Sequence, residues 1–159
     1  MAKELKIVLN PNPILRKKSV EIAPTEINDK LHELLLDMEE TMLKKDGAGL
    51  AAPQVGKNIR AIVIRHEEQT IFLINPRLTK KSWAREIEEE GCLSVLNDQG
   101  EIIYAPVARY KRVSCMYWNE KGQPQKINAE HMLARVIQHE IDHLDGILFI
   151  DKIVPNRKK

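Results

Sequence analysis

At 159 residues the chain has the length of a single domain, and its 43% hydrophobic and 30% charged residues are typical of a folded, soluble protein. The 25 basic and 23 acidic side chains leave a formal net charge of +2, which argues against a dedicated nucleic-acid groove. No stretch approaches the roughly 20 apolar residues of a membrane span. The start of the chain has charges within its first six residues and lacks the apolar core of a signal peptide. We therefore expect one cytoplasmic domain over residues 1–159, without DNA or membrane partners, in which Cys92 and Cys115 are reduced.

The first half of the chain predicts a helix followed by a β-hairpin. Apolar residues recur with the spacing of an amphipathic helix from Ile27 to Leu43, and two lysines and Gly47 follow where such a helix would end. "RAIVI" (60–64) and "TIFLI" (70–74) are short, rich in β-branched residues and separated by polar residues, a pattern typical of a hairpin.

Short strands and a second helix are expected in the second half. The helix should run from Ala129 to Leu144, with Asn128 as its N-cap and Gly146 just past its end. "NEKGQP" (119–124) is typical of a turn. The strands are expected at 83–88, 101–104, 107–117 and 125–128. A helix, several antiparallel strands and a second helix together predict an α+β domain.

The sequence "QHEIDH" (138–143) lies on the second predicted helix. His139 and His143 are four residues apart and share one helix face, so their imidazoles can hold a metal ion with Glu140 beside it as a base. Two histidines that only form hydrogen bonds would give the same pattern. A catalytic metal site needs a further protein ligand, because two nitrogen ligands do not make a stable centre.

Candidates for the third ligand lie on both sides of this motif. Asp145 and Asp151 follow it, but Asp145 is turned away from the histidine face. Upstream, Cys92 follows Gly91 in "EEEGCLSV" (88–95), where a thiolate would complete a Cys-His-His site with an open fourth position for water. A buried cysteine that acts only as a small hydrophobe is the simpler alternative.

A glycine-rich stretch, "GAGLAAPQ" (47–54), precedes the predicted hairpin. It carries little side-chain bulk and ends in the polar Gln54. Taken alone, it predicts only a connection that needs glycine, and it lacks the Gly-Lys-Ser/Thr of a phosphate-binding loop.

In this order and at these spacings, the three stretches resemble the peptide deformylase family, whose motifs are G-x-G-L-A-A-x-Q, E-G-C-L-S and Q-H-E-x-D-H. The chain has "GAGLAAPQ", "EGCLS" and "QHEIDH", and the similarity extends through "LINP" (73–76) and residues 133–151. The resemblance implies an α+β fold in which antiparallel or mixed β-sheets pack around a central, C-terminal, metal-binding helix.

The resemblance also implies a function. Members of the family remove the N-formyl group from the N-terminal formyl-methionine of newly synthesised polypeptides and release formate. The implied metal ligands are Cys92, His139 and His143, with water in the fourth position, and Glu140 would carry the proton. The implied ion is one iron(II) per chain, although zinc, nickel or cobalt also suits these ligands.

Further implied roles concern the substrate. The Gln54 side chain and the backbone N–H of Leu93 would stabilise the oxyanion, and the backbone of Gly49 would pair with the extended peptide. Asp142 would support the metal site without reacting. The methionine pocket would be formed by Ala48, Met132, Leu133 and Val136.

The expected partner is the N-formylmethionyl nascent peptide, with a transient ribosome contact through the basic tail "NRKK" (156–159). The chain is expected to be a monomer of bacterial type. Its C-terminal tail is expected to be flexible from about residue 154.

Several positions differ from the family pattern. Val95 and Leu96 stand where x-Pro is common, and Tyr104 aligns with an arginine that often contacts substrate. Glu88 stands where an apolar pocket residue is frequent, and Arg135 faces the pocket, where its stem can pack on methionine while its charge reaches water. These differences bear on peptide preference rather than on the metal site.

Two other functions fit parts of the sequence. An H-E-x-x-H metallopeptidase would cut unformylated peptides and would not need Cys92. A non-catalytic relative that binds nascent chains would not need Glu140 or Gln54, and both are present.

Overall fold

The computed structural model describes residues 1–155, which form two β-sheets and two α-helices. The five-stranded sheet has the order β1-β2-β3-β6-β7, and β4 and β5 form a second sheet. All the strand pairs are antiparallel. The strands are β1 (Gly49–Ala51), β2 (Ala61–His66), β3 (Gln69–Lys81), β4 (Arg85–Glu90), β5 (Ala105–Tyr110), β6 (Arg112–Trp118) and β7 (Pro124–Glu130). The helices are α1 (Asp29–Lys44) and α2 (His131–Leu144), and short 3-10 turns lie at Pro13–Arg16, Pro24–Glu26, Ala52–Val55 and Phe149–Lys152. The expected α+β class is confirmed.

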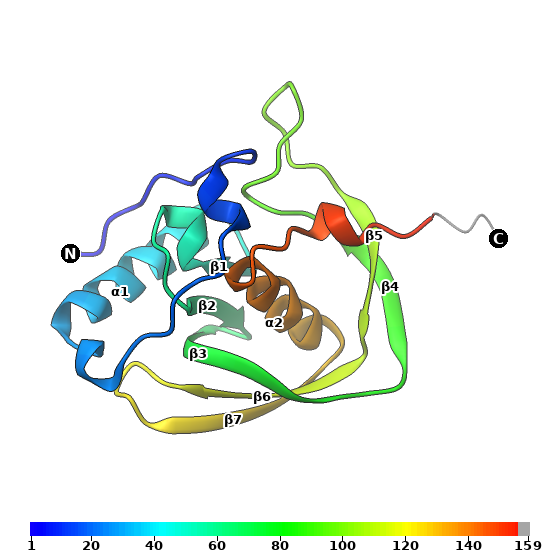
Figure 1. Cartoon of the computed structure of the whole chain (residues 1–159). Helices are drawn as coiled ribbons and strands as arrows, with labels where there is room; N and C mark the ends of the chain where they lie inside the picture. The colour runs from blue at the N-terminus through cyan, green and yellow to red at the C-terminus, as the bar shows by residue number, and fades with distance from the viewer. Residues whose placement is uncertain (156–159) are drawn as a thin grey trace.

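Helix α2 lies in the middle of the molecule, between the five-stranded sheet and the β4–β5 sheet, while α1 lies toward the opposite side of the large sheet (Figure 1). Strand β2 explains this layering, because its side chains alternate between the two faces. Ile62 and Ile64 pack in the cluster that contains α2, whereas Ala61 and Val63 pack in the cluster that contains α1. Both faces of β2 are therefore buried, which accounts for its continuous apolar run.

Helix α1 confirms the predicted amphipathic pattern, but its end differs in detail from the expectation. Asn28 caps the first turn by accepting a hydrogen bond from the Leu31 N–H at 3.1 Å. At the other end, the left-handed residue is Asp46, with φ of 51°, and not Gly47. Gly47 instead donates its N–H to the Met42 carbonyl at 2.9 Å, as the second residue past the cap does in a Schellman motif.

The β2–β3 hairpin is confirmed, whereas the strands that follow are only partly as expected. The region predicted as one strand at 107–117 is two strands, because the chain passes from one sheet to the other at Lys111. The prediction of a strand at 101–104 is wrong. That segment makes only an isolated bridge, between Leu96 and Ile102.

Helix α2 begins two residues later than expected. The predicted cap, Asn128, remains in β7, where its Oδ1 accepts a hydrogen bond from the Ser114 hydroxyl at 2.7 Å. The last residue of β7, Glu130, occupies the N-cap position instead. The predicted end is confirmed, since Gly146 has a φ of 75° and Ile147 donates its N–H to the Asp142 carbonyl at 2.9 Å.

Two expectations concern the surface and the tail. Among residues 1–155, no helix is both long enough and apolar enough to cross a membrane. Val154, where the flexible tail is expected to begin, donates its N–H to the Pro106 carbonyl at 2.9 Å. The basic tail at 156–159, proposed for ribosome contact, lies outside the described residues.

Candidate metal centre

The structure brings together the three residues expected to bind a metal. A ligand atom from each of Cys92, His139 and His143 lies within 4.8 Å of the other two. His139 and His143 are one turn apart on α2, with ring centroids 4.9 Å apart. Cys92 lies just beyond the end of β4, and its Sγ is 3.3 Å from Nε2 of His143. The segment after β4 and helix α2 thus present a thiol and an imidazole pair to the same point.

These three side chains suit a metal ion both in spacing and in chemistry. Two ligands on one tetrahedral ion, with metal–nitrogen and metal–sulfur bonds of about 2.1 and 2.3 Å, would be roughly 3.5 Å apart. The 3.3 Å between Cys92 and His143 is close to this value. Burial and the neighbouring His139 hold the pKa of His143 well below its ordinary value, which keeps its imidazole neutral, as a metal ligand must be. Sulfur and two nitrogens suit zinc, iron(II), nickel or cobalt.

Glu90 fixes the orientation of His139, although no role was assigned to it from the sequence. Its Oε1 lies 2.8 Å from Nδ1 of His139. Because an ionised carboxylate only accepts, Nδ1 carries the hydrogen and Nε2 is left to face the other two ligands. The signal was present in the sequence, since Glu90 is the first residue of "EGCLS".

The Glu90 carboxylate is itself held by arginines. Burial alone would raise its pKa, but hydrogen bonds from Arg109 and His139 overcome this effect and keep the pKa of Glu90 well below its usual value. Nη1 of Arg109 also donates to Asp142 at 2.5 Å, and Asp142 accepts from Lys152 at 2.9 Å. Asp142 is thus connected to the centre through Arg109, in keeping with the supporting role expected of it.

Glu140 points into the same space without a partner for one of its oxygens. The residue is buried, and within the described part of the chain its Oε2 has no hydrogen-bond partner. Burial raises the pKa of the Glu140 carboxyl to about 7. Such a carboxylate can accept a proton from a nearby reacting group and return it.

Two potential donors for an oxyanion lie next to Cys92. Nε2 of Gln54 lies 3.5 Å from the Cys92 Sγ and donates to the Ser94 hydroxyl at 3.1 Å, while its Oε1 accepts from the Ala51 N–H at 2.9 Å. The amide of Gln54 is therefore fixed with its NH₂ group toward the ligand cluster. The backbone N–H of Leu93 donates to no acceptor among residues 1–155.

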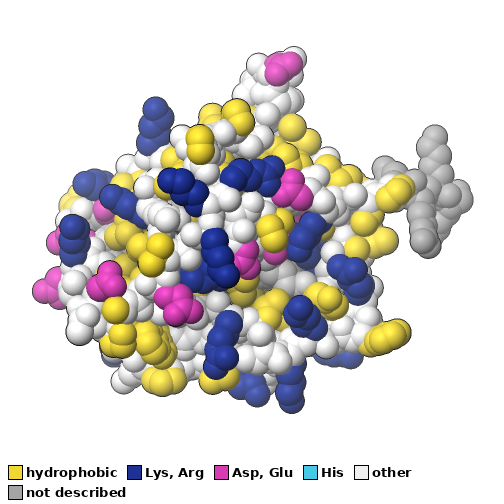
Figure 2. Space-filling view, in the orientation of Figure 1, with side chains coloured by type: hydrophobic (Ala, Val, Ile, Leu, Met, Phe, Trp, Pro, Cys, Tyr) yellow, Lys and Arg dark blue, Asp and Glu magenta, His cyan; other side chains and the backbone are white. Residues whose placement is uncertain are grey.

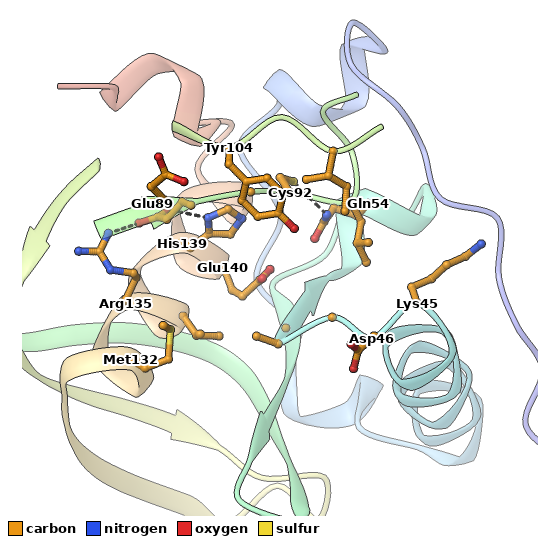
Figure 3. A pocket seen from close by; sticks show the side chains of 18 residues that line it. Lys45, Asp46, Gln54, Glu89, Cys92, Tyr104, Met132, Arg135, His139 and Glu140 are labelled. Atoms are coloured by element: carbon orange, nitrogen blue, oxygen red, sulfur yellow. Dashed lines mark hydrogen bonds and ion pairs between the residues drawn. The ribbon is translucent and has the colours of Figure 1, made fainter. Parts of the chain in front are cut away.

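A cavity of about 260 Å³ opens beside these residues. Its lining includes Glu140, His139 and Met132 from α2, together with Tyr104, all of which are labelled in Figure 3. Of the residues expected to contact substrate or to act in the reaction, the wall includes Ala48, Gly49, Gln54, Leu93, Met132, Val136 and Glu140. Leu133 is not part of this wall, because its side chain packs against the core cluster of α2 and the large sheet.

The positions that differ from the family pattern have separate locations. Tyr104 lines the cavity, and its ring lies so close to Gly91 that a side-chain carbon there would be 2.7 Å away. Glu88 is exposed on β4 and does not line the cavity. The expectation that the Arg135 charge reaches water is wrong. Arg135 is 4% exposed, and Nη1 donates to the Glu90 carboxylate at 2.6 Å.

The cavity is bordered by an edge of the large sheet. On one side, Gly49 of β1 pairs with Ile64 of β2. Strand β1 is the first in the sheet order, and its other edge has no strand partner among the described residues. On the face seen in Figure 2, basic side chains are spread widely among hydrophobic ones, and acidic side chains are fewer. An extended chain could therefore lie along β1 with one side chain directed into the cavity.

Comparison with known proteins gives a consistent picture. A family model described as polypeptide deformylase matches residues 4–159. The peptide deformylase of Dictyoglomus thermophilum is 42% identical over 148 residues, which cover 93% of this chain and 92% of that protein. The peptide deformylase of Halothermothrix orenii is 46% identical over 145 residues, which cover 90% and 89%.

Solved structures are similar over the same extent. The crystal structure of peptide deformylase from Thermotoga maritima matches with a TM-score of 0.89 and 36% identity, over 96% of this chain and 99% of that one. A Met-Ala-Ser-bound class I type b peptide deformylase from Acinetobacter baumannii matches with a TM-score of 0.89 and 31% identity, over 96% and 100%.

Proposed function

Because the chain belongs to the polypeptide deformylase family, we propose that Cys92, His139 and His143 hold the divalent ion on which its activity depends. The chain is a metal-dependent hydrolase that removes the N-formyl group from newly synthesised polypeptides. The observation that carries the proposal is the convergence of the three ligand atoms within 4.8 Å, next to a carboxylate oxygen that has no partner in the described structure.

The identity of the ion is a finer proposal, which follows from the donor set. A thiolate and two imidazoles suit iron(II), zinc, nickel and cobalt, and we take iron(II) as the native ion on the family resemblance. When bound, such an ion lowers the pKa of water and polarises the formyl oxygen.

Glu140 handles the proton in the proposed reaction. Its Oε2 makes no hydrogen bond within the described residues, so it can take up the proton that the attacking water loses. The same carboxyl then delivers this proton to the nitrogen of the departing amine. Because Glu140 is buried, its carboxyl is shielded from bulk solvent.

Gln54 and Leu93 stabilise the negative oxygen that forms during attack. The Gln54 amide is held by Ala51 and Ser94, so its donor position is set before substrate binds. The Leu93 N–H supplies a second donor without giving up a bond in the described structure. Donors that are already oriented act on the transition state without a cost of rearrangement, and losing one typically slows a reaction by about 10²–10³.

The substrate peptide binds as an added strand along β1. Main-chain bonds to Gly49 would hold it, and the methionine side chain would enter the cavity beside Ala48, Met132 and Val136. In this arrangement the cavity encloses the first side chain of the peptide. The next side chain makes fewer contacts, because alternate side chains of a strand point to opposite faces. The Acinetobacter baumannii relative has a solved structure with Met-Ala-Ser bound, in keeping with a peptide ligand.

We also propose that the chain works as a monomer in the bacterial cytoplasm, where formylated chains are made. All three ligands and the cavity come from one chain, so a second subunit is not needed to complete the site. A transient ribosome contact would keep the enzyme close to emerging chains. Analytical ultracentrifugation, alone and with ribosomes, would test the oligomeric state and the contact.

The decisive experiment measures formate released from formyl-Met-Ala-Ser. Protein prepared without oxygen and loaded separately with iron(II), nickel or zinc should release formate, and iron(II) should support the fastest reaction. Cys92→Ala should lose both the metal and the activity, which also separates this site from a His-Glu-His peptidase site. If none of the metal-loaded forms releases formate, the proposed assignment of the site is wrong.

A further inference from the structure

Arg135 is a second buried guanidinium on the carboxylate that orients His139. Its side chain leaves α2 and reaches β4 and β5, where it is 4% exposed. Nη1 donates to Oε2 of Glu90 at 2.6 Å and to the Val107 carbonyl at 2.9 Å, and Nη2 donates to the Glu86 carbonyl at 2.8 Å. One planar group thus holds three acceptors, two of them on β4 and one on β5.

These contacts divide the two oxygens of Glu90 between different partners. Oε2 accepts from Arg135 at 2.6 Å and from Nε of Arg109 at 2.8 Å. Oε1 accepts from Nη2 of Arg109 at 2.9 Å and lies 2.8 Å from Nδ1 of His139. With Oε2 engaged by two guanidinium groups, the carboxylate cannot rotate, and Oε1 remains directed at His139.

Arg135 also spans the two structural parts that supply the ligands. Cys92 follows β4 in the chain, while His139 lies one turn beyond Arg135 on α2. In Figure 3, dashed lines run from Arg135 and from His139 toward the carboxylate that lies between them. The guanidinium therefore ties the β4–β5 sheet to the helix at the level of the site.

We propose that Arg135 is a positioning residue for the metal centre, acting through Glu90 on His139. This inference rests on the proposed role of Cys92, His139 and His143 as ligands. A group that fixes the partner of a ligating histidine sets the direction of the ligating nitrogen, and loss of such a group typically weakens metal binding by about 10–100-fold. Arg135 also lines the proposed substrate cavity.

Two variants separate the guanidinium from the rest of the side chain. Arg135→Met keeps an unbranched stem along the cavity and removes every donor, and Glu90 retains the charge of Arg109. Arg135→Lys keeps a positive charge but replaces the planar fork of donors with one compact ammonium group, which cannot span the same three acceptors. Arg60→Met is the matched control. Arg60 also holds α2, through Nη1 bonds to the Leu144 carbonyl at 3.0 Å and to Asp145 at 2.9 Å, but it does not contact Glu90.

The test measures cobalt(II) and zinc affinity by chelator competition, together with the visible spectrum of the cobalt(II) form. We expect Arg135→Met to lower both affinities by about 10-fold or more and to change the cobalt spectrum, with Arg135→Lys between it and the wild type. Arg60→Met should match the wild type in both. If Arg135→Met keeps wild-type affinity and spectrum, or if Arg60→Met weakens binding as much, the inference fails.

Two further results keep the interpretation clear. If the methionine variant does not fold, Arg135→Lys is judged by the same criteria, so a wild-type spectrum and affinity there overturn the inference. If the wild-type protein itself does not bind cobalt(II) or zinc, the proposed ligand assignment fails, and not only the role of Arg135.

Discussion

Gly49 and Glu140 approach so closely that a side-chain carbon at position 49 would lie 2.8 Å from Oε1 of Glu140. Gly49 belongs to the edge strand β1 and Glu140 to the central helix α2. The absence of a side chain at Gly49 is therefore what lets the edge strand proposed to bind the peptide and the carboxylate proposed to carry the proton share one space.

Gly49→Ala should accordingly impair the reaction more than the fold. Real side-chain carbons essentially never come within 3.0 Å of such atoms, so Glu140 must move away from the ligand cluster. Displacing a catalytic group by about 1 Å costs on the order of 10²-fold in rate, and we expect a fall in kcat of roughly that size. Formate release and thermal unfolding measured on the same sample would check this. An unchanged kcat would show that Glu140 does not need its present position.

Glu140→Gln should remove the proton carrier and leave the metal ligands in place. The two side chains have nearly the same shape, and Gln cannot take up a proton at neutral pH. General acid–base groups typically contribute about 10²–10⁴-fold, so kcat should fall within that range. Metal content, measured by mass spectrometry of the metal, should equal that of the wild type. Retention of most of the activity would assign the proton transfer to another group.

The two cysteines should differ in their reaction with iodoacetamide. Cys115 is fully buried in the core, and burial raises its pKa to about 11, so it remains a thiol at mildly alkaline pH. Cys92 lines the cavity. Treatment with a chelator should therefore permit one alkylation per chain in intact-mass spectra, and Cys92→Ala should show none. Labelling of Cys115 in folded protein would contradict this account.

The ion pair between Arg16 and Asp151 should make a small, pH-dependent contribution to stability. The hydrogen bond from Arg16 holds the pKa of the Asp151 carboxyl below its usual value. The ionised form therefore stabilises the fold above an unfolded pKa of about 3.9, and this stabilisation is lost as the pH falls through the folded pKa. The two side chains are 44% and 39% exposed, so the contribution should stay below about 1 kcal/mol.

Urea unfolding of the metal-free protein tests this contribution. Asp151→Asn should be slightly less stable than the wild type near pH 7, and the difference should shrink below about pH 3. Asp98→Asn, which replaces an exposed carboxylate with no ion-pair partner among the described residues, is the control. A difference that persists unchanged in acid would assign the effect to something other than the charge of Asp151.

Elements with strong local patterns could be predicted from the sequence, while those decided by distant partners could not. Helix α1 and the β2–β3 hairpin follow from apolar spacing and turn residues within each segment. The start of α2 depends on β7, because Asn128 bonds to Ser114 across the sheet instead of capping the helix. The break at Lys111 likewise depends on which sheet each half of the segment joins.

The site shows the same division. The grouping of Cys92 with two histidines could be expected from the resemblance, since each lies in a fixed motif. The buried charge of Arg135 could not, because its acceptors lie 45 and 28 residues away, on Glu90 and Val107, and no local pattern reveals such a pairing. Leu133 shares the apolar pattern of α2, but that pattern does not distinguish a cavity wall from the core.

The separation of the proposed ligands along the sequence affects the stability of the protein. Cys92 and His143 are 51 residues apart, so an ion held between them would act as a crosslink that closes a long loop. Unfolding would then require release of the ion, and its binding energy would add to the stability of the fold. Chains made when metal is scarce would unfold more often and be degraded sooner, so metal supply would govern the abundance of the enzyme as well as its activity.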